Sequence, residues 1–488
     1  DGNTTATLTA GNFTATGAID GDTVVLNATG ATYDNKNVGT GKTVTATGIT
    51  ASASNGTAAV YGYTVLPDSA SGAIGEITPA TLTVSSIGAV STIYGTPAAT
   101  GTVTLSGVVT GDAVGSTASI VSPASSTSGN LRAGAYAQAA TTLNGADAGN
   151  YTLTSYTTPT LNYTVGQLAL SGTAIAAAGS TYGSPLNPGA VSFGNAIGGD
   201  IVGSTASVNT TTLSGSGNAI VGSYTQTAGA LVGADAANYS FGGFTSASNY
   251  TITPLALTAS SIAAVNATYG TPAATGAVAL SGVVAGDTVG STASIVSPAY
   301  STSGNLRAGA YAQTATTLGG ADSGNYTLTP YTTPTANYSV GQFALTGGIT
   351  ADNKVYDGTT AATIASRSLT GVVGADDVSY AGGTASFAER NVGTGKAVTA
   401  SGLALAGADA GNYTVNSTAT TMADITARPI TVSAATNTKV YDGTTSAAAT
   451  PGITGGSLAT GDAANFTQRY ADRNAGTGKT LIAAGAVN

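Results

Sequence analysis

The sequence predicts a mostly β protein built as a tandem array of domains of about 87 residues. A Tyr-Gly or Tyr-Asp-Gly signal recurs at intervals of 88, 87, 87 and 85 residues by subtraction: Tyr94, Tyr182, Tyr269, Tyr356 and Tyr441. A second signal, GADAGNY or a close variant, recurs with the same spacing and ends at Tyr151, Tyr239, Tyr326 and Tyr413. Two motifs at constant phase indicate repeated domains that share one template.

Short alternating runs predict that these domains are made of strands. Polar and apolar residues alternate over 81–84, 151–154 and 163–165, which places Leu, Val and Tyr on one face and Thr on the other. Turn signals such as Gly-Asp, Asp-Gly and Ser-Gly separate the runs every eight to twelve residues or so, the rhythm of an all-β fold. At most one short helix per domain is expected, around the alanine-rich stretch Ala135–Thr142.

The domain boundaries follow a phrase that closes one repeat and opens the next, as in NYTVGQLAL at 162–170 and NYSVGQFAL at 337–345. The predicted segments are a partial repeat 1–79, the full repeats 80–166, 167–254, 255–341 and 342–429, and a partial repeat 430–488. No Gly/Ser-rich or charged linker intervenes. Short junctions restrict relative domain motion, so we expect an elongated, stiff rod rather than a flexible string.

The repeats fall into two subtypes. Repeats 80–166 and 255–341 are near duplicates at an offset of 175 residues, and 167–254 is their diverged relative. Repeats 1–79, 342–429 and 430–488 instead carry DGNTT or DGTT and then NVGTGK or NAGTGK. Each repeat has few large aliphatic residues, so its core is expected to depend on tyrosine.

Composition excludes several classes of function. With 13 basic and 22 acidic side chains the net charge is −9, and no basic cluster suited to nucleic acid is present. Cysteine and histidine are absent, and glutamate occurs only at Glu76 and Glu389, so no enzyme is expected. No apolar run approaches the roughly 18–20 residues of a membrane span, so no membrane insertion is expected.

The motifs resemble two related families of repeat domain. KVYDGTT at 354–360 and 439–445, NVGTGK at 391–396 and GADAGNYTV at 407–415 resemble YDG-type domains. IYGTP at 93–97 and TYGTP at 268–272 are similar to the MBG, or "mostly β-grasp", repeats. The resemblance assigns 1–79, 342–429 and 430–488 to the YDG type and the other three repeats to the MBG type. It implies small β-grasp-like or β-sandwich-like domains of filamentous-haemagglutinin-like, two-partner-secreted bacterial adhesins, located outside the cell or on its surface.

We therefore predict a stalk or shaft segment that projects an adhesive tip away from a bacterial cell. The expected partners are neighbouring repeats of the same longer chain, and a host or matrix surface reached through regions outside this chain. A first alternative is a self-associating extracellular filament or biofilm-matrix fibre, in which other copies of the chain are partners. A second is carbohydrate binding through an exposed tyrosine cluster repeated once per domain.

No catalytic, cofactor-binding or metal-binding residue is predicted, although three motifs invite such an assignment. Tyr356-Asp357-Gly358 and Tyr441-Asp442-Gly443 are interpreted as tight hairpin turns, because Asp-Gly suits positive φ angles. The acid and amide of GADAGNY are interpreted as local turn hydrogen bonds rather than calcium ligands, at Asp147 and Asn150, Asp235 and Asn238, Asp322 and Asn325, and Asp409 and Asn412.

The lysine that ends GTGK is the third such motif, at Lys42, Lys396 and Lys479. A phosphate loop would need the longer GxxxxGK[ST] phrase between a strand and a helix, and no helix is indicated here. An isopeptide bond between Lys396 and Asn391 is an alternative. An ion pair or a solvated lysine is the interpretation that we favour.

Overall fold

The computed structural model describes residues 1–488, and its regular structure consists of strands and five 3-10 helices of three residues each. The prediction of a mostly β protein with tandem small sheets is confirmed. None of the helices has the length or apolar composition needed to cross a membrane. The chain divides into two compact units, each described by itself below.

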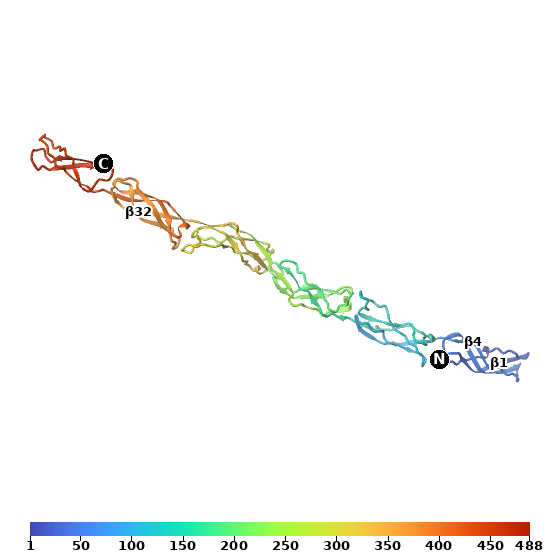
Figure 1. Cartoon of the computed structure of the whole chain (residues 1–488). Coiled ribbons are helices and arrows are strands. Elements are labelled where there is room, and N and C mark those ends of the chain that lie inside the picture. Colours follow the sequence, from blue (N-terminus) through green and yellow to red (C-terminus); the bar gives the residue numbers. More distant parts are fainter. The chain divides into compact units, whose positions relative to one another are not determined.

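Unit 1 comprises residues 1–180, 184–211 and 222–252, and it begins with the sheet of repeat 1–79. Two long antiparallel partners, β1 and β4, flank β2, and β3 pairs with the far part of β2 (Figure 1). The elements are η1 (Ala10–Asn12), β1 (Asp22–Tyr33), β2 (Gly39–Asn55), β3 (Ala58–Val60) and β4 (Ser69–Ile77).

Repeat 80–166 contains three small sheets, with strand orders β11-β5-β7, β6-β13-β9 and β12-β10-β8. The pairs β5–β11 and β6–β13 are parallel, and the others are antiparallel. The elements are β5 (Ala80–Ile87), β6 (Val90–Ile93), β7 (Val103–Ser106), β8 (Ser119–Ile120), β9 (Gly134–Tyr136), β10 (Gln138–Ala140), η2 (Ala148–Asn150), β11 (Tyr151–Leu153), β12 (Tyr156–Thr157) and β13 (Tyr163–Gly166).

The part of repeat 167–254 that lies in unit 1 keeps this pattern with shorter ladders. β14 pairs with β21 in parallel, whereas β15–β17, β18–β20 and β19–β22 are antiparallel. The elements of this repeat are β14 (Leu168–Ala169), β15 (Ala174–Ile175), β16 (Ala178–Thr181), β17 (Val191–Ser192), β18 (Gly203–Val208), β19 (Gly222–Tyr224), β20 (Gln226–Val232), η3 (Ala236–Asn238), β21 (Tyr239–Ser240) and β22 (Tyr250–Thr253).

Unit 2 comprises residues 181–183, 212–221 and 253–488. Its repeat 255–341 has the three sheets of its near duplicate, in the orders β25-β23-β29, β24-β31-β27 and β26-β28-β30. The elements are β23 (Leu255–Ile262), β24 (Val265–Thr268), β25 (Val278–Ser281), β26 (Ser294–Ile295), β27 (Gly309–Tyr311), β28 (Gln313–Ala315), η4 (Ser323–Asn325), β29 (Tyr326–Thr329), β30 (Tyr331–Thr332) and β31 (Tyr338–Gly341).

The last two repeats of unit 2, 342–429 and 430–488, have longer strands. In repeat 342–429, β32 (orange in Figure 1) lies between β35 and β38, and a five-stranded sheet has the order β33-β39-β37-β36-β34. In repeat 430–488, β40 pairs with β41 and β42 pairs with β43. The elements are β32 (Phe343–Ala351), β33 (Lys354–Val355), β34 (Ala361–Ala362), β35 (Ile364–Thr370), β36 (Ser379–Phe387), β37 (Gly393–Ala406), η5 (Ala410–Asn412), β38 (Tyr413–Val415), β39 (Thr418–Thr426), β40 (Thr431–Ser433), β41 (Gly452–Gly455), β42 (Ala464–Tyr470) and β43 (Leu481–Val487).

The alternation of apolar and polar residues along a strand explains which side chains form the cores. In β5, Leu82 and Val84 are buried while Thr81 and Thr83 face solvent. A bulge between Val84 and Ser86 then inserts one residue, so that Ile87 faces the core again. Val84 and Ile87 pack with Ala118 and Ala140 to form the core of the repeat.

The predicted position of the short helix is wrong. Residues 135–142 lie largely in β9 and β10, which pair with β13, β8 and β12. Alanine's helix propensity is a weak preference that strand pairing overrides. The short helix lies instead within GADAGNY, at η2, η3, η4 and η5.

A buried glutamine joins three segments in each of the repeats 80–166, 167–254 and 255–341. The Gln138 side chain is fully buried; its Oε1 accepts the Gly101 N–H at 2.6 Å. Its Nε2 donates to the Gly88 carbonyl and to Asn162 Oδ1, both at 3.0 Å. Gln226 and Gln313 are buried in the same way and make the equivalent bonds.

Replacing Gln138 by leucine should destabilise the repeat by about 2–3 kcal/mol, because the Gly101 N–H and the Gly88 carbonyl lose a buried partner. Chemical denaturation measures the loss. The matched control is Gln167→Leu, which removes one exposed hydrogen bond and should cost no more than about 0.5 kcal/mol. Equal effects of the two substitutions would contradict the structural role of Gln138.

Candidate functional site: the contacts between successive repeats

The tyrosines of the two recurring motifs lie together where one repeat contacts the next, and both bind the same aspartate. In unit 1, the hydroxyls of Tyr94 and Tyr239 both donate to Asp200 Oδ2 at 2.5 Å. Tyr94 belongs to repeat 80–166, whereas Asp200 and Tyr239 belong to the next repeat. The two rings pack edge to face, with centroids 5.3 Å apart. We call this set a Tyr–Asp–Tyr clasp.

Unit 2 contains the same clasp twice. Tyr269 and Tyr413 donate to Asp376, and their ring centroids lie 5.1 Å apart. Tyr182 and Tyr326 donate to Asp287, with a centroid distance of 5.2 Å. In each case the first tyrosine comes from the earlier repeat, and the aspartate and second tyrosine come from the later one. The clasp is therefore a repeated feature of the chain.

Local structure places the aspartate between the tyrosines. Asp200 follows Gly199 in a tight turn, where its N–H donates to the Ile197 carbonyl at 3.1 Å. The Ile197 N–H in turn donates to the Tyr239 hydroxyl at 3.1 Å, which aligns that hydroxyl with the carboxylate. From the earlier repeat, the Ser128 N–H donates to Asp200 Oδ1 at 3.2 Å.

These donors keep the shared carboxylate ionised. Burial alone would raise the pKa of Asp200, but bonds from Ser128, Tyr239 and Tyr94 outweigh burial and lower the pKa to about 2. The pKa of Asp287 and that of Asp376 are lowered by the same balance. Burial and the bond to Asp200 raise the pKa of Tyr239, so its hydroxyl keeps its proton. At neutral pH the aspartate is therefore ionised and can accept, and the tyrosine is protonated and can donate, so both groups are in the state that the clasp needs.

The acid and amide of GADAGNY form a second set of bonds across the same boundary. Asp235 accepts the Thr127 N–H at 3.2 Å and pairs with Arg132 at 3.2 Å, and Asn238 Oδ1 accepts the Ala133 N–H at 3.0 Å. Arg307, Asp409 and Asn412 repeat this arrangement in unit 2. The interpretation of these residues as local turn bonds is therefore wrong, because the N–H groups that their side chains accept lie between 32 and 112 residues earlier in the chain.

The glycine of the Tyr-Gly signal allows the backbone of one repeat to lie against an aliphatic side chain of the next. Gly95 has φ of +82°, and a Cβ at this position would lie 2.2 Å from Ile197 Cδ1 of the next repeat.

The hairpin interpretation of Tyr356-Asp357-Gly358 is wrong, because the flanking strands β33 and β34 pair with β39 and β36 rather than with each other. Asp357 instead pairs with Lys354 at 2.9 Å and shapes the loop that presents Tyr356.

The first contact of unit 1 is formed around Asp112. Asp112 forms an ion pair with Lys36 of repeat 1–79 and accepts a bond from Tyr151 of its own repeat at 2.7 Å. The bond from Lys36 and then that from Tyr151 lower the pKa of Asp112. Asn150 Oδ1 also accepts the Val38 N–H at 2.9 Å. Lys36 lies three residues before the GTGK glycine of its repeat, as Arg390 does in its own, so this position supplies a cation to the aspartate of the next repeat.

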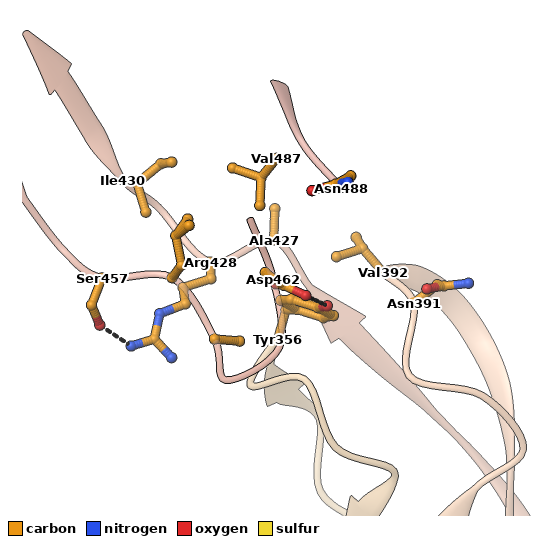
Figure 2. A pocket seen from close by; sticks show the side chains of 12 residues that line it. Tyr356, Asn391, Val392, Ala427, Arg428, Ile430, Ser457, Asp462, Val487 and Asn488 are labelled. Atoms are coloured by element: carbon orange, nitrogen blue, oxygen red, sulfur yellow. Dashed lines mark hydrogen bonds between the residues drawn. The ribbon is translucent and has the colours of Figure 1, made fainter. Parts of the chain in front are cut away.

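The last contact of unit 2 joins Tyr356 to Asp462. Tyr356 donates to Asp462 at 2.9 Å, and Arg390 lies 4.0 Å from the same carboxylate. Figure 2 shows Tyr356 and Asp462 among the residues that line a cavity of about 320 Å³. The lining of the cavity comes from both repeats, including Val392, Ala427 and Val487.

Apolar packing continues across the boundaries as well. Tyr94, Tyr163 and Val165 of repeat 80–166 form one buried cluster with Tyr239 of the next repeat. One residue separates β13 from β14, and one residue separates β31 from β32. The boundary is therefore part of a continuous core within each unit.

The GTGK lysines form ion pairs, as the favoured interpretation predicted. Lys396 pairs with Glu389, Lys479 pairs with Asp472, and Lys42 lies 3.2 Å from Asp34. Glu389 also accepts a bond from Asn391 at 3.1 Å. Its carboxylate is more than half exposed, and the bond from Lys396 lowers its pKa, so it is poorly suited to protonate an amide during isopeptide formation.

The shared aspartates are the functional residues that the sequence reasoning missed, since Gly-Asp was read only as a turn. A positional signal was available. Asp112, Asp200 and Asp287 each lie 39 residues before the GADAGNY tyrosine by subtraction, and each lies three residues after an aliphatic residue. This recurrence marks the aspartates as fixed positions of the shared template, as it does the tyrosines.

The YDG domain family model matches residues 1–71, 342–421 and 426–487, which fall in the repeats predicted to be of this type. No characterised protein matches the chain. A solved structure that aligns is the Down Syndrome Cell Adhesion Molecule, isoform 1.30.30, with its N-terminal eight Ig domains. It has 10% identity over 94% of this chain and 85% of that chain, and the TM-score of 0.12 supports no further conclusion.

Removing one clasp hydroxyl should loosen a boundary without disturbing ring packing. Tyr269→Phe keeps the edge-to-face contact with Tyr413 but takes a donor from buried Asp376, so we expect a loss of about 1–3 kcal/mol in guanidinium denaturation. Tyr300→Phe, at an exposed tyrosine of the same repeat, is the control and should change little. A loss of the same size in both variants would refute the clasp.

Acid should weaken the boundaries before it affects neutral parts of the fold. The folded pKa of Asp200 is about 2, below the unfolded value of about 3.9, so its stabilisation is fully present above about pH 4. The stabilisation is then lost as the pH falls from about 4 toward 2. Denaturation midpoints measured between pH 7 and 2 test this prediction. In Asp200→Asn, the midpoint should depend less on pH below about 4 than it does in the parent protein. The same pH dependence in the variant and the parent would contradict the prediction.

Proposed function

We propose that this chain is a structural stalk segment of a large secreted bacterial surface adhesin. The observation that carries the proposal is the clasp, which occurs once in unit 1 and twice in unit 2 and joins an earlier repeat to the next by hydrogen bonds and ring packing, with a core that continues across the boundary. Domains joined in this way resist bending, as a stalk requires. The YDG match over three segments supports an extracellular repeat protein.

The repeating tyrosines support a structural role more than a binding role. Carbohydrate binding would need an exposed tyrosine cluster in every repeat, but the tyrosines of both motifs are buried in the MBG-type repeats. The strongly exposed tyrosines, Tyr61, Tyr300 and Tyr441, occur at different places in their repeats. The carbohydrate hypothesis therefore loses the feature on which it rested.

Small-angle scattering at low protein concentration tests the stalk. Strands of about ten residues, at roughly 3.3 Å each, predict a maximum dimension of roughly 200 Å for the six repeats in a line. A compact particle would overturn the proposal.

A matched pair of glycine variants tests whether the boundaries supply the stiffness. A Cβ at Gly270 would lie 2.8 Å from Val373 of the next repeat, whereas one at Gly304 would have open space, and both have φ near +80°. Gly270→Ala should therefore increase bending in electron micrographs, and Gly304→Ala should not. Equal bending in the two variants would contradict clasp-dependent stiffness.

A further inference from the structure

In three of the repeats, an opening strand lies beside the last strand and runs in the same direction. In repeat 255–341, β24 follows the first strand β23, and β31 is the last strand before the boundary. β24 and β31 pair in parallel over four residues each, beginning with Val265 opposite Tyr338. Repeat 80–166 has the same parallel pair, β6 with β13, and repeat 342–429 has β33 with β39.

The direction of these strands decides how a repeat responds to tension along the chain. Tension from the preceding repeat reaches β24 at its amino end, through β23, and tension toward the next repeat leaves β31 at its carboxyl end. Because the strands are parallel, these two points lie at opposite ends of the ladder. The strands are therefore pulled lengthwise past each other, and all the hydrogen bonds of the ladder are loaded together. In an antiparallel pair the two points would lie at the same end, and the bonds would break one after another.

Further hydrogen bonds hold both ends of the β24–β31 ladder. The Val265 N–H donates to the Asn337 carbonyl at 2.9 Å at one end, and the Tyr269 N–H donates to the Gly341 carbonyl at 2.8 Å at the other. The Asn337 side chain also donates to the carbonyl of Ile262, the last residue of β23, at 2.9 Å. Peeling the ladder from either end therefore requires breaking bonds beyond its paired residues.

The clasp fixes the carboxyl end of β24. Tyr269 directly follows this strand, and its hydroxyl donates to Asp376 of the next repeat. One residue separates β31 from β32, which pairs in parallel with β38 from Tyr413, the second tyrosine of the clasp. The next repeat therefore holds the ends of both strands, β31 through the chain and β24 through the clasp.

We propose that the parallel pair β24–β31, with its counterparts β6–β13 and β33–β39, forms a shear clamp that lets the array bear tension along the chain. The inference deepens the proposed stalk function, on which its biological role rests, because a stalk is pulled whenever its adhesive tip binds. Stiffness and resistance to tension are separate properties. Scattering and micrographs test the first and unfolding under force tests the second, so either proposal can fail alone.

Optical-tweezers measurements at constant force on residues 1–488 test the clamp by changing the direction of tension. The chain has no cysteine, so introduced cysteines are unique attachment points. Handles at Pro254→Cys and Gln342→Cys load the ladder lengthwise. Handles at Ala264→Cys and Ala336→Cys instead pull the amino ends of β24 and β31 apart, and all four positions are exposed.

Forced unfolding is governed by the unfolding rate, so the rates at one force are compared. Pulling the amino ends apart should unfold the repeat at least about tenfold faster than lengthwise tension, because the four residue pairs then separate singly. Equal rates in the two directions would overturn the proposal.

Two proline substitutions test which ladder bears the load. Val265→Pro removes the N–H that bonds to Asn337, and it should raise the unfolding rate under lengthwise tension about fivefold. The control, Val296→Pro, removes the N–H that bonds to the Ala312 carbonyl at 2.9 Å, beside the β26–β28 ladder. That ladder lies between β24 and β31 in sequence, outside the path of tension, so the rate should change less than about twofold.

Chemical denaturation of both proline variants measures what each substitution costs without force. If Val296→Pro accelerates forced unfolding as much as Val265→Pro does, the clamp is refuted. The comparison of pulling directions leaves the ladder unaltered, so it decides the question even where Val265→Pro does not fold.

Discussion

The arrangement depends on a carboxylate that is removed from water between two repeats and must be given hydrogen-bond donors there. A charge in such a place is costly unless it is paired or bonded. Asp376 is buried, and its donors come from both sides of the boundary: Tyr269 and Ser303 from one repeat, Tyr413 from the other. Separating the repeats would remove two of these three donors, Tyr269 and Ser303. The electrostatic requirement of one residue therefore couples two domains.

The donors vary while the aspartate remains. Asp200, Asp287 and Asp376 are held by two tyrosines, Asp112 by a lysine and a tyrosine, and Asp462 by a tyrosine with a nearby arginine. Arg132 and Arg307 support two of the contacts, and the contact around Asp287 forms without such an arginine pair. A carboxylate that accepts bonds from both repeats is common to the three clasps.

Sequence reasoning could find the strands and the tyrosines because their signals are local or periodic. Thr81–Val84 shows its inward face by alternation, and Tyr94 and Tyr239 stand out by spacing. Asp200 looks like an ordinary turn residue, since nothing nearby shows that a tyrosine 106 residues earlier donates to it. The helix expected over 135–142 and the hairpin expected at Tyr356 failed for the same reason: distant pairing decided both.

The constant period now has two physical causes. Each repeat must fold, which fixes Leu82 and Gln138, and each must also present a tyrosine at one boundary and an aspartate at another. The second requirement ties the surface of every repeat to that of its neighbour. A repeat that meets both requirements can follow any other, because the presenting and accepting surfaces match throughout the array. Whole repeats can therefore be gained or lost without a new interface, and the near identity of repeats 80–166 and 255–341 is what such exchange would leave.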